Sequence, residues 1–411
     1  MIEYAKQTDT SRSWIRDRIF LGLTFGEYVK RLITPFNIVA GIIVLVGLVL
    51  IGIRFTQGLG AVTAASQEQP WGLFLAWGLF SGVPLSATGF VLGTAVYIFG
   101  LKEYHPVVKN AILIGFLGYL FAVIFLLVDL GRPWRLPYPM FVSFGTPSVL
   151  FFVAWSVSLH LALYLVEFSP SISAWGGWKT LRRWASAITV GLTIFLIALS
   201  TLHQSALGAM FLLAPGKLYP LWYSPYIPHL FLISAIAAGL CLVILASLLS
   251  RWFLKDQADP TYLTSLDKIT LGLGTASSFV LIAYFAVKII ALAHGNHWNL
   301  LNTSYGYMFL FELFIFTLLP CFLFVFAGRR GKVGLVQVTA LLTIIGVVFN
   351  RFNVSLFALN WQLPHREFFN WKEFLILIAI VTIQILVYRG FVIRMPVLRE
   401  HPEFKGEHAV I

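Results

Sequence analysis

The sequence predicts an all-α integral membrane protein with about ten transmembrane helices. Hydrophobic residues make up 59% of the 411 residues and charged residues only 11%, whereas about a quarter of a soluble domain is charged. The mean hydropathy is +0.85. Apolar runs long enough to cross a bilayer as a helix, about 20 residues, recur along the whole chain. A net charge of +12 therefore indicates sorting of charge between membrane faces, and no nucleic-acid partner is expected.

The predicted spans follow one another at short intervals. They cover residues 33–55, 71–99, 107–130, 146–167, 184–211, 226–253, 267–292, 304–327, 334–358 and 372–393. Residues 1–32 form an N-terminal segment, and residues 394–411 form a C-terminal tail. Pro84 and Pro320 are expected to kink their spans because proline removes a backbone donor. Gly89 and Gly93 have the GxxxG spacing typical of close helix contact.

Lysine and arginine predict the orientation. With the N-terminus in the cytoplasm, the cytoplasmic segments contain 21 basic residues and the outer loops five. Such residues concentrate in cytoplasmic loops, so both termini are predicted to be cytoplasmic. The outer loops 131–146 and 212–226 are rich in Pro, Trp and Tyr. They fit either an aromatic belt or a rigid docking surface for an extracytoplasmic partner, to which Arg132, Arg135 and Lys217 would contribute.

Ionisable residues within the spans fall mainly in the outer half of the predicted membrane domain. Asp129, His203, His229, Lys288, Glu312 and Arg351 lie there, on six different spans. His160 and Glu167, both on the fourth span, are expected to lie toward the inside. An ionisable group inside a bilayer costs several kcal/mol unless it has partners or water. The pattern therefore predicts one polar pocket in the outer leaflet, with Glu312 facing Arg351 or Lys288.

A polar pocket that opens to lipid suits a quinone, whose reduction requires hydrogen-bond donors at two oxygens and groups that deliver protons. His203 and Glu312 are candidates for proton transfer, and Arg351 and Lys288 for stabilising negative charge on the reduced ring. The candidate quinone-binding residues are His203, Gln204, Asn350, Asn353, His229 and Asp129. The chain has only two cysteines, Cys241 and Cys321, and an iron–sulfur cluster requires about four. No metal site is predicted, and electrons would come from another subunit.

Two other functions fit parts of this pattern. A haem b cytochrome needs histidine pairs at matching depth; His203 and His229 could pair, whereas His160 is expected to lack a partner at its depth. A transporter usually has its binding site at the membrane midplane, between broken helices, whereas the ionisable residues here lie higher.

Four stretches resemble the NrfD/PsrC family of membrane quinone-interacting subunits. They are "LITPFN" at 32–37, "DLGRPWR" at 129–135, "STLHQSALGAMFLLAPGKLYPLWYSP" at 200–225 and "RFN" at 351–353. The sequence is most similar to the ten-helix branch that includes the hydrogenase HybB subunit and the integral membrane subunit of the Qrc complex. The resemblance covers essentially the whole chain.

The resemblance implies two four-helix bundles, residues 71–211 and 226–358, related by a pseudo-twofold axis and flanked by further helices. It also implies a multi-pass protein of the bacterial inner membrane that reduces menaquinone near the periplasmic face. The implied partners are a periplasmic ferredoxin-like iron–sulfur subunit and further catalytic or multihaem cytochrome c subunits, with no haem or cluster in this chain. A proton route from the cytoplasm is implied as well, for which His160 and Glu167 are the available inner groups.

Overall fold

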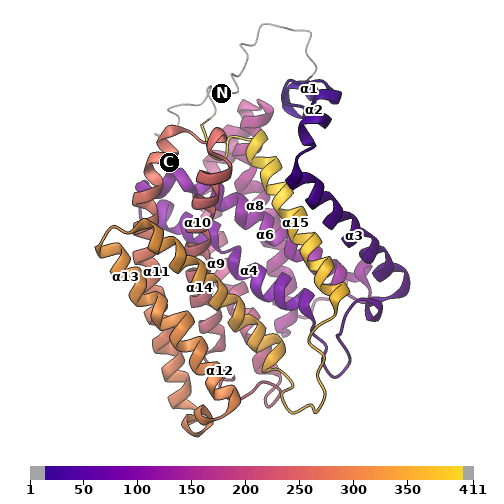
Figure 1. The fold of residues 1–411 in the computed structure, drawn as a ribbon, viewed down its shortest axis with the longest axis vertical. Coiled ribbons are helices and arrows are strands. Elements are labelled where there is room, and N and C mark those ends of the chain that lie inside the picture. The colour runs from indigo at the N-terminus through magenta and orange to yellow at the C-terminus, as the bar shows by residue number, and fades with distance from the viewer. Residues whose placement is uncertain (1–13, 401–411) are drawn as a thin grey trace.

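A computed structural model describes residues 14–400 as helices joined by loops (Figure 1). Within these residues, ten helices are long and apolar enough to cross a membrane, which confirms the predicted all-α membrane fold. The parts of the predicted terminal segments at 1–13 and 401–411 lie outside the described residues.

The spans have the following bounds. They are α3 (Pro35–Gln57); the interrupted second span η2 (Phe74–Ser81), α4 (Gly82–Leu85), α5 (Thr88–Gly93) and η3 (Thr94–Ile98); α6 (His105–Asp129); α8 (Val149–Gly176); α9 (Lys179–Ala209) with η6 (Met210–Leu213); α10 (Ile227–Phe253); α11 (Pro260–His294); α12 (Ser304–Leu313), η9 (Phe314–Leu318) and α13 (Leu319–Arg329); α14 (Val333–Phe352) with η10 (Asn353–Phe357); and α15 (Trp371–Arg394). The short helices α1 (Trp14–Arg18) and α2 (Phe25–Leu32) precede them, and α7 (Tyr138–Phe141) lies between α6 and α8.

Several helices extend beyond the predicted apolar spans. The fourth continues to Gly176 and ends where Gly177 adopts a left-handed conformation with φ +80°, as is common at helix C-termini. The seventh begins at Pro260, a first-turn position at which the missing N–H costs nothing. Hydropathy marks the apolar part of each helix, whereas these caps mark its real ends.

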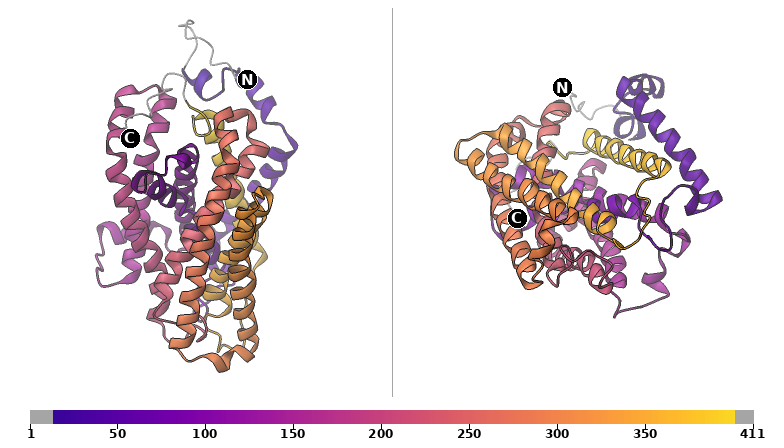
Figure 2. Two further views of the ribbon diagram at one scale, coloured as in Figure 1. Left: turned by 90° about the vertical axis from the view of Figure 1, so that its left-hand side faces the viewer. Right: turned by 60° about the horizontal axis from the view of Figure 1, so that its bottom comes forward.

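The spans pack as two groups of four with the same order of neighbours. The second span packs on α6, α6 on α8, α8 on α9, and α9 returns to the second span; we call this the first bundle. In the second bundle α10 packs on α11, α11 on α13, α13 on α14, and α14 on α10. The bundles meet where α10 packs against α9 and the second span. Helices α3 and α15 pair beside them (Figures 1 and 2).

The two chain ends described by the structure lie on one face, which we call the terminal face. The Arg394 guanidinium, at the end of α15, donates to the Tyr28 hydroxyl and, from Nε, to the carbonyl of Ile19 at 3.3 Å. The opposite, distal face carries the loops that follow α3, α6, η6, α11 and η10. Both described ends therefore share a side of the membrane.

The two aromatic loops of the distal face differ. Loop 131–146 is exposed, with Trp134 67% and Phe141 79% accessible. Loop 212–226 instead folds over the second bundle, where Tyr219 N–H donates to the carbonyl of Ala358 at 2.9 Å. Its Trp222 is only 3% accessible. The docking interpretation therefore fits the first loop and the exposed Lys217 of the second.

Prolines interrupt helices close to the buried polar residues. The second span is π-helical before Gly82 and breaks at Ser86–Ala87, just after Pro84. Pro320 follows the π-helical segment η9, which begins two residues after Glu312. Another π-helical segment, η10, begins at Asn353. Such segments are frequent at functional sites.

Candidate functional site

A buried ion pair lies in the second bundle. Lys288 Nζ of α11 is 3.0 Å from Glu312 Oε1 of α12, and the two residues are 5% and 3% accessible. Of the two cations predicted to face Glu312, Lys288 therefore makes the direct contact. A charge pair shielded from water in this way is costly to break, because either partner alone would be an uncompensated buried charge.

Three more donors complete the environment of Glu312. Asn350 Nδ2 donates to Oε1 at 2.7 Å, and Asn353 Nδ2 donates to Oε2 at 2.8 Å. Trp222 Nε1 reaches Oε2 from the distal loop at 3.0 Å. Each carboxylate oxygen thus accepts two hydrogen bonds. We call Trp222, Lys288, Glu312, Asn350 and Asn353, together with Arg351, the carboxylate cluster.

Arg351 joins this cluster through Asn350. Its guanidinium donates to Asn350 Oδ1 at 2.8 Å, to Ser234 Oγ at 2.7 Å and to the carbonyl of Phe231 at 3.2 Å. It also lies 3.6 Å from the centroid of the Phe231 ring, a cation–π contact. Arg351 is fully buried. Two cations and one carboxylate leave the cluster with a net positive charge.

A small cavity adjoins the carboxylate. It has a volume of about 20 Å³ and is lined by polar and apolar residues, among them Ser234, Tyr284, Glu312, Thr317 and Asn350. A cavity of this size with several polar partners has room for a water molecule. The carboxylate cluster is therefore closely packed, with space for about one water.

The first bundle contains a separate histidine cluster. The rings of His160 on α8 and His203 on α9 have centroids 5.5 Å apart. His160 Nδ1 lies 2.7 Å from the carbonyl of Ser156, and its Nε2 lies 2.8 Å from Ser200 Oγ. His203 Nδ1 hydrogen-bonds the Ser156 hydroxyl. The two histidines are thus linked through Ser156.

The predicted inner position of His160 is wrong. His160 lies 11 residues after the start of α8 and His203 lies 10 residues before the end of η6. At 1.5 Å per residue both are about 15 Å from the distal end of their span. The prediction failed because the predicted fourth span ended at residue 167, whereas the helix continues for nine more residues to Gly176 at the terminal face. His160 therefore belongs with His203, and the expectation that it has no partner at its depth is wrong too.

Four buried polar atoms of the histidine cluster make no hydrogen bond of normal length in the described part of the chain, although the Tyr119 hydroxyl lies near the Gln204 side chain and the Tyr164 hydroxyl near the backbone of Phe90. They are Tyr119 Oη, Tyr164 Oη, His203 Nε2 and Gln204 Oε1. Tyr119 is stacked on His160 with ring centroids 4.4 Å apart and an interplanar angle of 3°. The Gln204 amide nitrogen donates to the carbonyl of Val83, beside the break in the second span, at 3.2 Å. Unpartnered buried polar atoms are rare in native proteins and call for an explanation such as a ligand or water.

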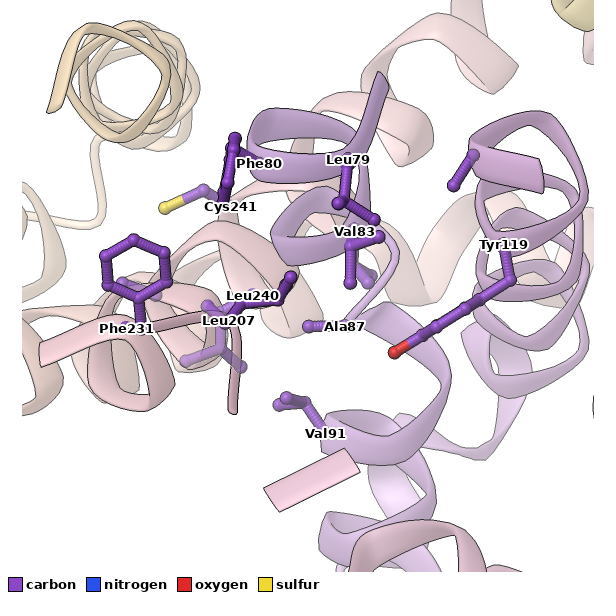
Figure 3. Packing of buried hydrophobic residues seen from close by; sticks show 14 of the residues in the cluster. Leu79, Phe80, Val83, Ala87, Val91, Tyr119, Leu207, Phe231, Leu240 and Cys241 are labelled. Atoms are coloured by element: carbon purple, nitrogen blue, oxygen red, sulfur yellow. The ribbon is translucent and has the colours of Figure 1, made fainter. Parts of the chain in front are cut away.

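An apolar layer separates the two clusters. In Figure 3, Phe231, which lies against Arg351, and Tyr119, which lies against His160, have Val83, Ala87, Leu207 and Leu240 between them. All of these are buried. The prediction of a single pocket is therefore wrong: the sequence shows depth along each helix, but it does not show which bundle a side chain faces.

The other predicted residues lie apart from both clusters. His229 is exposed at the start of α10. Asp129 ends α6, and Arg54 of α3 binds the carbonyls of its neighbours Val128 and Leu130. Glu167 is buried nearer the terminal face, where its Oε1 accepts from Thr193 Oγ1 at 3.2 Å. Arg132 and Arg135 are exposed on the distal face.

Several residues of the two buried clusters were not predicted, because nothing in the sequence sets them apart. Tyr119, Tyr164 and Trp222 resemble the many aromatic residues of a membrane protein that face lipid or the interface. Ser234 is one of many small polar residues within spans. Glu373 of α15 is different, since a carboxylate inside a predicted span is itself a signal. It is fully buried and accepts from Phe74 N–H and Thr63 Oγ1, both at 3.0 Å.

The fold and these clusters define a multi-pass membrane protein with a polar interior in each of two helix bundles. The chain belongs to the NrfD family: the family described as polysulphide reductase, NrfD, matches residues 61–360. It is thus a multi-pass protein of the bacterial inner membrane.

Three relatives extend the comparison. A protein of Nitratidesulfovibrio vulgaris is 46% identical over 381 residues, covering 92% of this chain and 98% of that protein. The probable Ni/Fe-hydrogenase 2 b-type cytochrome subunit of Escherichia coli is 28% identical, covering 87% of this chain and 91% of the relative. The integral membrane subunit of the menaquinone reductase of N. vulgaris is 25% identical, covering 78% and 79%.

Proposed function

We propose that this chain is the quinone-reactive membrane subunit of a periplasm-facing oxidoreductase complex. Electrons from a docked iron–sulfur subunit would reduce menaquinone, which takes up two electrons and two protons to become the quinol. Family membership and the names of relatives, which include a menaquinone reductase subunit and a hydrogenase subunit, support this class. In this proposal the distal face is periplasmic, in line with the distribution of lysine and arginine.

The unpartnered polar atoms of the histidine cluster carry the proposal. His203 Nε2 and the Tyr119 hydroxyl can donate hydrogen bonds to a quinone oxygen, and Gln204 Oε1 can accept one from a quinol. Leu202, next to His203 in the sequence, is 47% accessible on the outer surface of α9. In this proposal a lipid-soluble substrate approaches the cluster from the bilayer across this surface.

Residues on one face of α8 suit proton delivery from the terminal face. His160, Tyr164 and Glu167 follow one another at i, i+4 and i+7, a spacing that places side chains on the same face of a helix. All three are buried, and the rings of His160 and Tyr164 have centroids 6.1 Å apart. Tyr164 thus occupies the interval between the two groups proposed to transfer protons.

We assign the carboxylate cluster a supporting role. Among the described residues Arg351 Nε and Asn353 Oδ1 have no partner, but Glu312 and the terminal nitrogens of Arg351 are occupied by protein partners. Arg351, Lys288 and Glu312, with Asn350 and Asn353, would therefore hold a positive charge beside the first bundle instead of contacting the quinone. An Arg351→Leu variant that still assembles into the complex distinguishes the two roles. Direct contact with the quinone predicts that its turnover is abolished, whereas a supporting role predicts that turnover remains.

The experiment uses the purified complex with its native partners, a reduced dye as electron donor and a menaquinone analogue as acceptor. His203→Asn should lower turnover by about 10²-fold or more, the usual range for loss of a proton-transfer group, while the subunits still co-purify. His294→Asn, an exposed histidine, is the matched control and should retain activity. Full turnover in His203→Asn would refute the proposal.

The name of the E. coli relative raises the alternative of a haem b cytochrome. The histidine cluster does not fit haem, because both ring nitrogens of His160 are already bound to Ser156 and Ser200 and its ring is stacked on Tyr119. His203 and His229, the pair suggested by sequence, are buried and exposed, respectively. The absorbance spectrum of the reduced, purified complex in the haem region, resolved by subunit, tests this alternative. Substrate flux in liposomes containing the chain alone tests the transporter alternative.

A further inference from the structure

Helix α2 (Phe25–Leu32) has a cleanly divided surface. At 100° per residue, Phe25, Tyr28, Val29 and Leu32 fall within an arc of about 100°. Gly26, Glu27, Lys30 and Arg31 occupy the opposite side. A short helix with one apolar and one charged side needs an environment that is apolar on one side and aqueous on the other.

The protein itself does not cover most of the apolar side. Phe25 is 68% accessible, and Val29, Leu32 and the following Ile33 are exposed as well. Trp14 and Ile15 of α1, just before α2, are also exposed. Figures 1 and 2 show α1 and α2 at the terminal face, beside the start of α3. Helix α1 touches the first bundle through Trp14, whose ring centroid lies 5.3 Å from that of Trp175 on α8.

The position of α2 along the membrane normal is fixed by α3. Only Ile33 and Thr34 separate the end of α2 from α3, whose 23 residues extend about 35 Å. That length matches the hydrocarbon core of a bilayer, about 30 Å. The hydrogen bond between Arg394 and the Tyr28 hydroxyl also holds α2 against α15. Helix α2 therefore lies at the membrane boundary.

The polar side of α2 is basic and pre-formed. Thr24 and Glu27 form a capping box, and the hydrogen bonds that the Thr24 backbone N–H and hydroxyl donate lower the pKa of Glu27. Lys30 and Arg31 lie in the last turn of α2, and Arg16 and Arg18 lie on α1. With Asp17 and Glu27 as the acidic residues, α1 and α2 carry more positive than negative charge.

We propose that α2 is an interfacial helix that lies in the leaflet at the terminal face and binds anionic lipid headgroups. Its apolar side enters the boundary between headgroups and acyl chains, as for other interfacial amphipathic helices. Lys30 and Arg31 contact lipid phosphates. This proposal concerns membrane anchoring and does not depend on the identity of the substrate.

The first experiment places spin labels on the full chain in its complex, in nanodiscs containing anionic lipid. Single cysteines are introduced by Phe25→Cys, Gly26→Cys, Val29→Cys and Lys30→Cys. The native Cys241 and Cys321 are buried, and the unsubstituted chain is the labelling control. The spin labels at 25 and 29 should be relaxed mainly by oxygen, because oxygen partitions into lipid. The spin labels at 26 and 30 should be relaxed mainly by a water-soluble paramagnetic agent. Equal exposure of all four to water would overturn the proposal, and so would shielding of 25 and 29 from both agents, which would indicate a protein partner.

The second experiment tests the headgroups. Mass spectrometry measures how much anionic lipid co-purifies with the wild type and with a Lys30→Gln/Arg31→Gln variant. The variant should lose anionic lipid relative to the wild type, whereas the control Arg329→Gln/Lys332→Gln, at the same face but away from α2, should lose less. Equal retention in the wild type and in the α2 variant would refute headgroup binding by these two residues.

Discussion

Trp222 Nε1 donates a hydrogen bond to Glu312 Oε2 at 3.0 Å, so a loop of the distal face reaches the buried carboxylate of the second bundle. This bond links the packing of loop 212–226 to the stability of the carboxylate cluster.

Trp222→Phe should destabilise the protein by about 1–3 kcal/mol, because Glu312 Oε2 would lose a donor in a buried site. Thermal unfolding of the detergent-purified chain measures the change. Trp134→Phe removes an equivalent indole from the exposed loop and should leave the unfolding temperature unchanged; equal effects of the two variants would contradict the role of Trp222.

Lys288 and Glu312 should behave as a coupled pair. Either Lys288→Met or Glu312→Gln leaves one buried charge without its partner, at a cost of about 3–5 kcal/mol. The double variant removes both charges and should be more stable than the sum of the single effects predicts. A double-mutant cycle on unfolding measures this coupling, and strict additivity would show that the pair does not interact.

Tyr119→Phe should separate ligand binding from stability. The substitution keeps the ring that stacks on His160 but removes a hydroxyl that makes no hydrogen bond of normal length among the described residues. We therefore expect little loss of stability and a higher KM for the menaquinone analogue. Tyr388→Phe is the matched control, because its hydroxyl donates to Asn110 Oδ1 at 2.8 Å; it should lose about 1 kcal/mol of stability and keep its KM.

Gly208→Ala should weaken the junction between the bundles. A Cβ at Gly208 would lie 2.8 Å from the carbonyl oxygen of Ile227 and 2.9 Å from Pro228 Cα. Backbone cannot yield as a side chain can, so the expected cost is about 1–3 kcal/mol. Gly191→Ala on the same helix meets nothing within 4 Å and should be slightly stabilising, because alanine has the higher helix propensity. Comparable unfolding temperatures for the two variants would argue against close packing at Gly208.

If the proposed periplasmic partner docks on loop 131–146, Arg132→Glu/Arg135→Glu should reduce its co-purification. The effect should be largest at low salt, because charges at the rim of an interface act mainly through long-range attraction. Both arginines are exposed, so the unfolding temperature should not change. Lys102→Glu, exposed at the terminal face, is the control. Unaltered partner recovery at every salt concentration would exclude this loop from docking.

Sequence alone could predict the helices because hydropathy reports burial in lipid directly. It also identified Glu312, Lys288 and Arg351 as residues that need partners, since charge within an apolar span is costly. It could not assign His160 to His203, because the terminal-face end of the fourth span is set by the cap at Gly177 instead of by apolar composition. Nor could it separate the two clusters, because the apolar layer of Leu207 and Leu240 is indistinguishable in sequence from any other part of a span. Tyr119 and Tyr164 were missed for the same reason.

Glu373 has a consequence for biosynthesis. It lies in the first turn of the last helix, yet it accepts the backbone N–H of Phe74 at the start of the second. Until α15 has been synthesised and inserted, the Phe74 N–H lacks its carboxylate acceptor. The interrupted second span then has an unpaired backbone donor. Nascent chains truncated before residue 371 should therefore be held by the insertion machinery or degraded, which makes arrival of the last helix a quality-control step for the whole subunit.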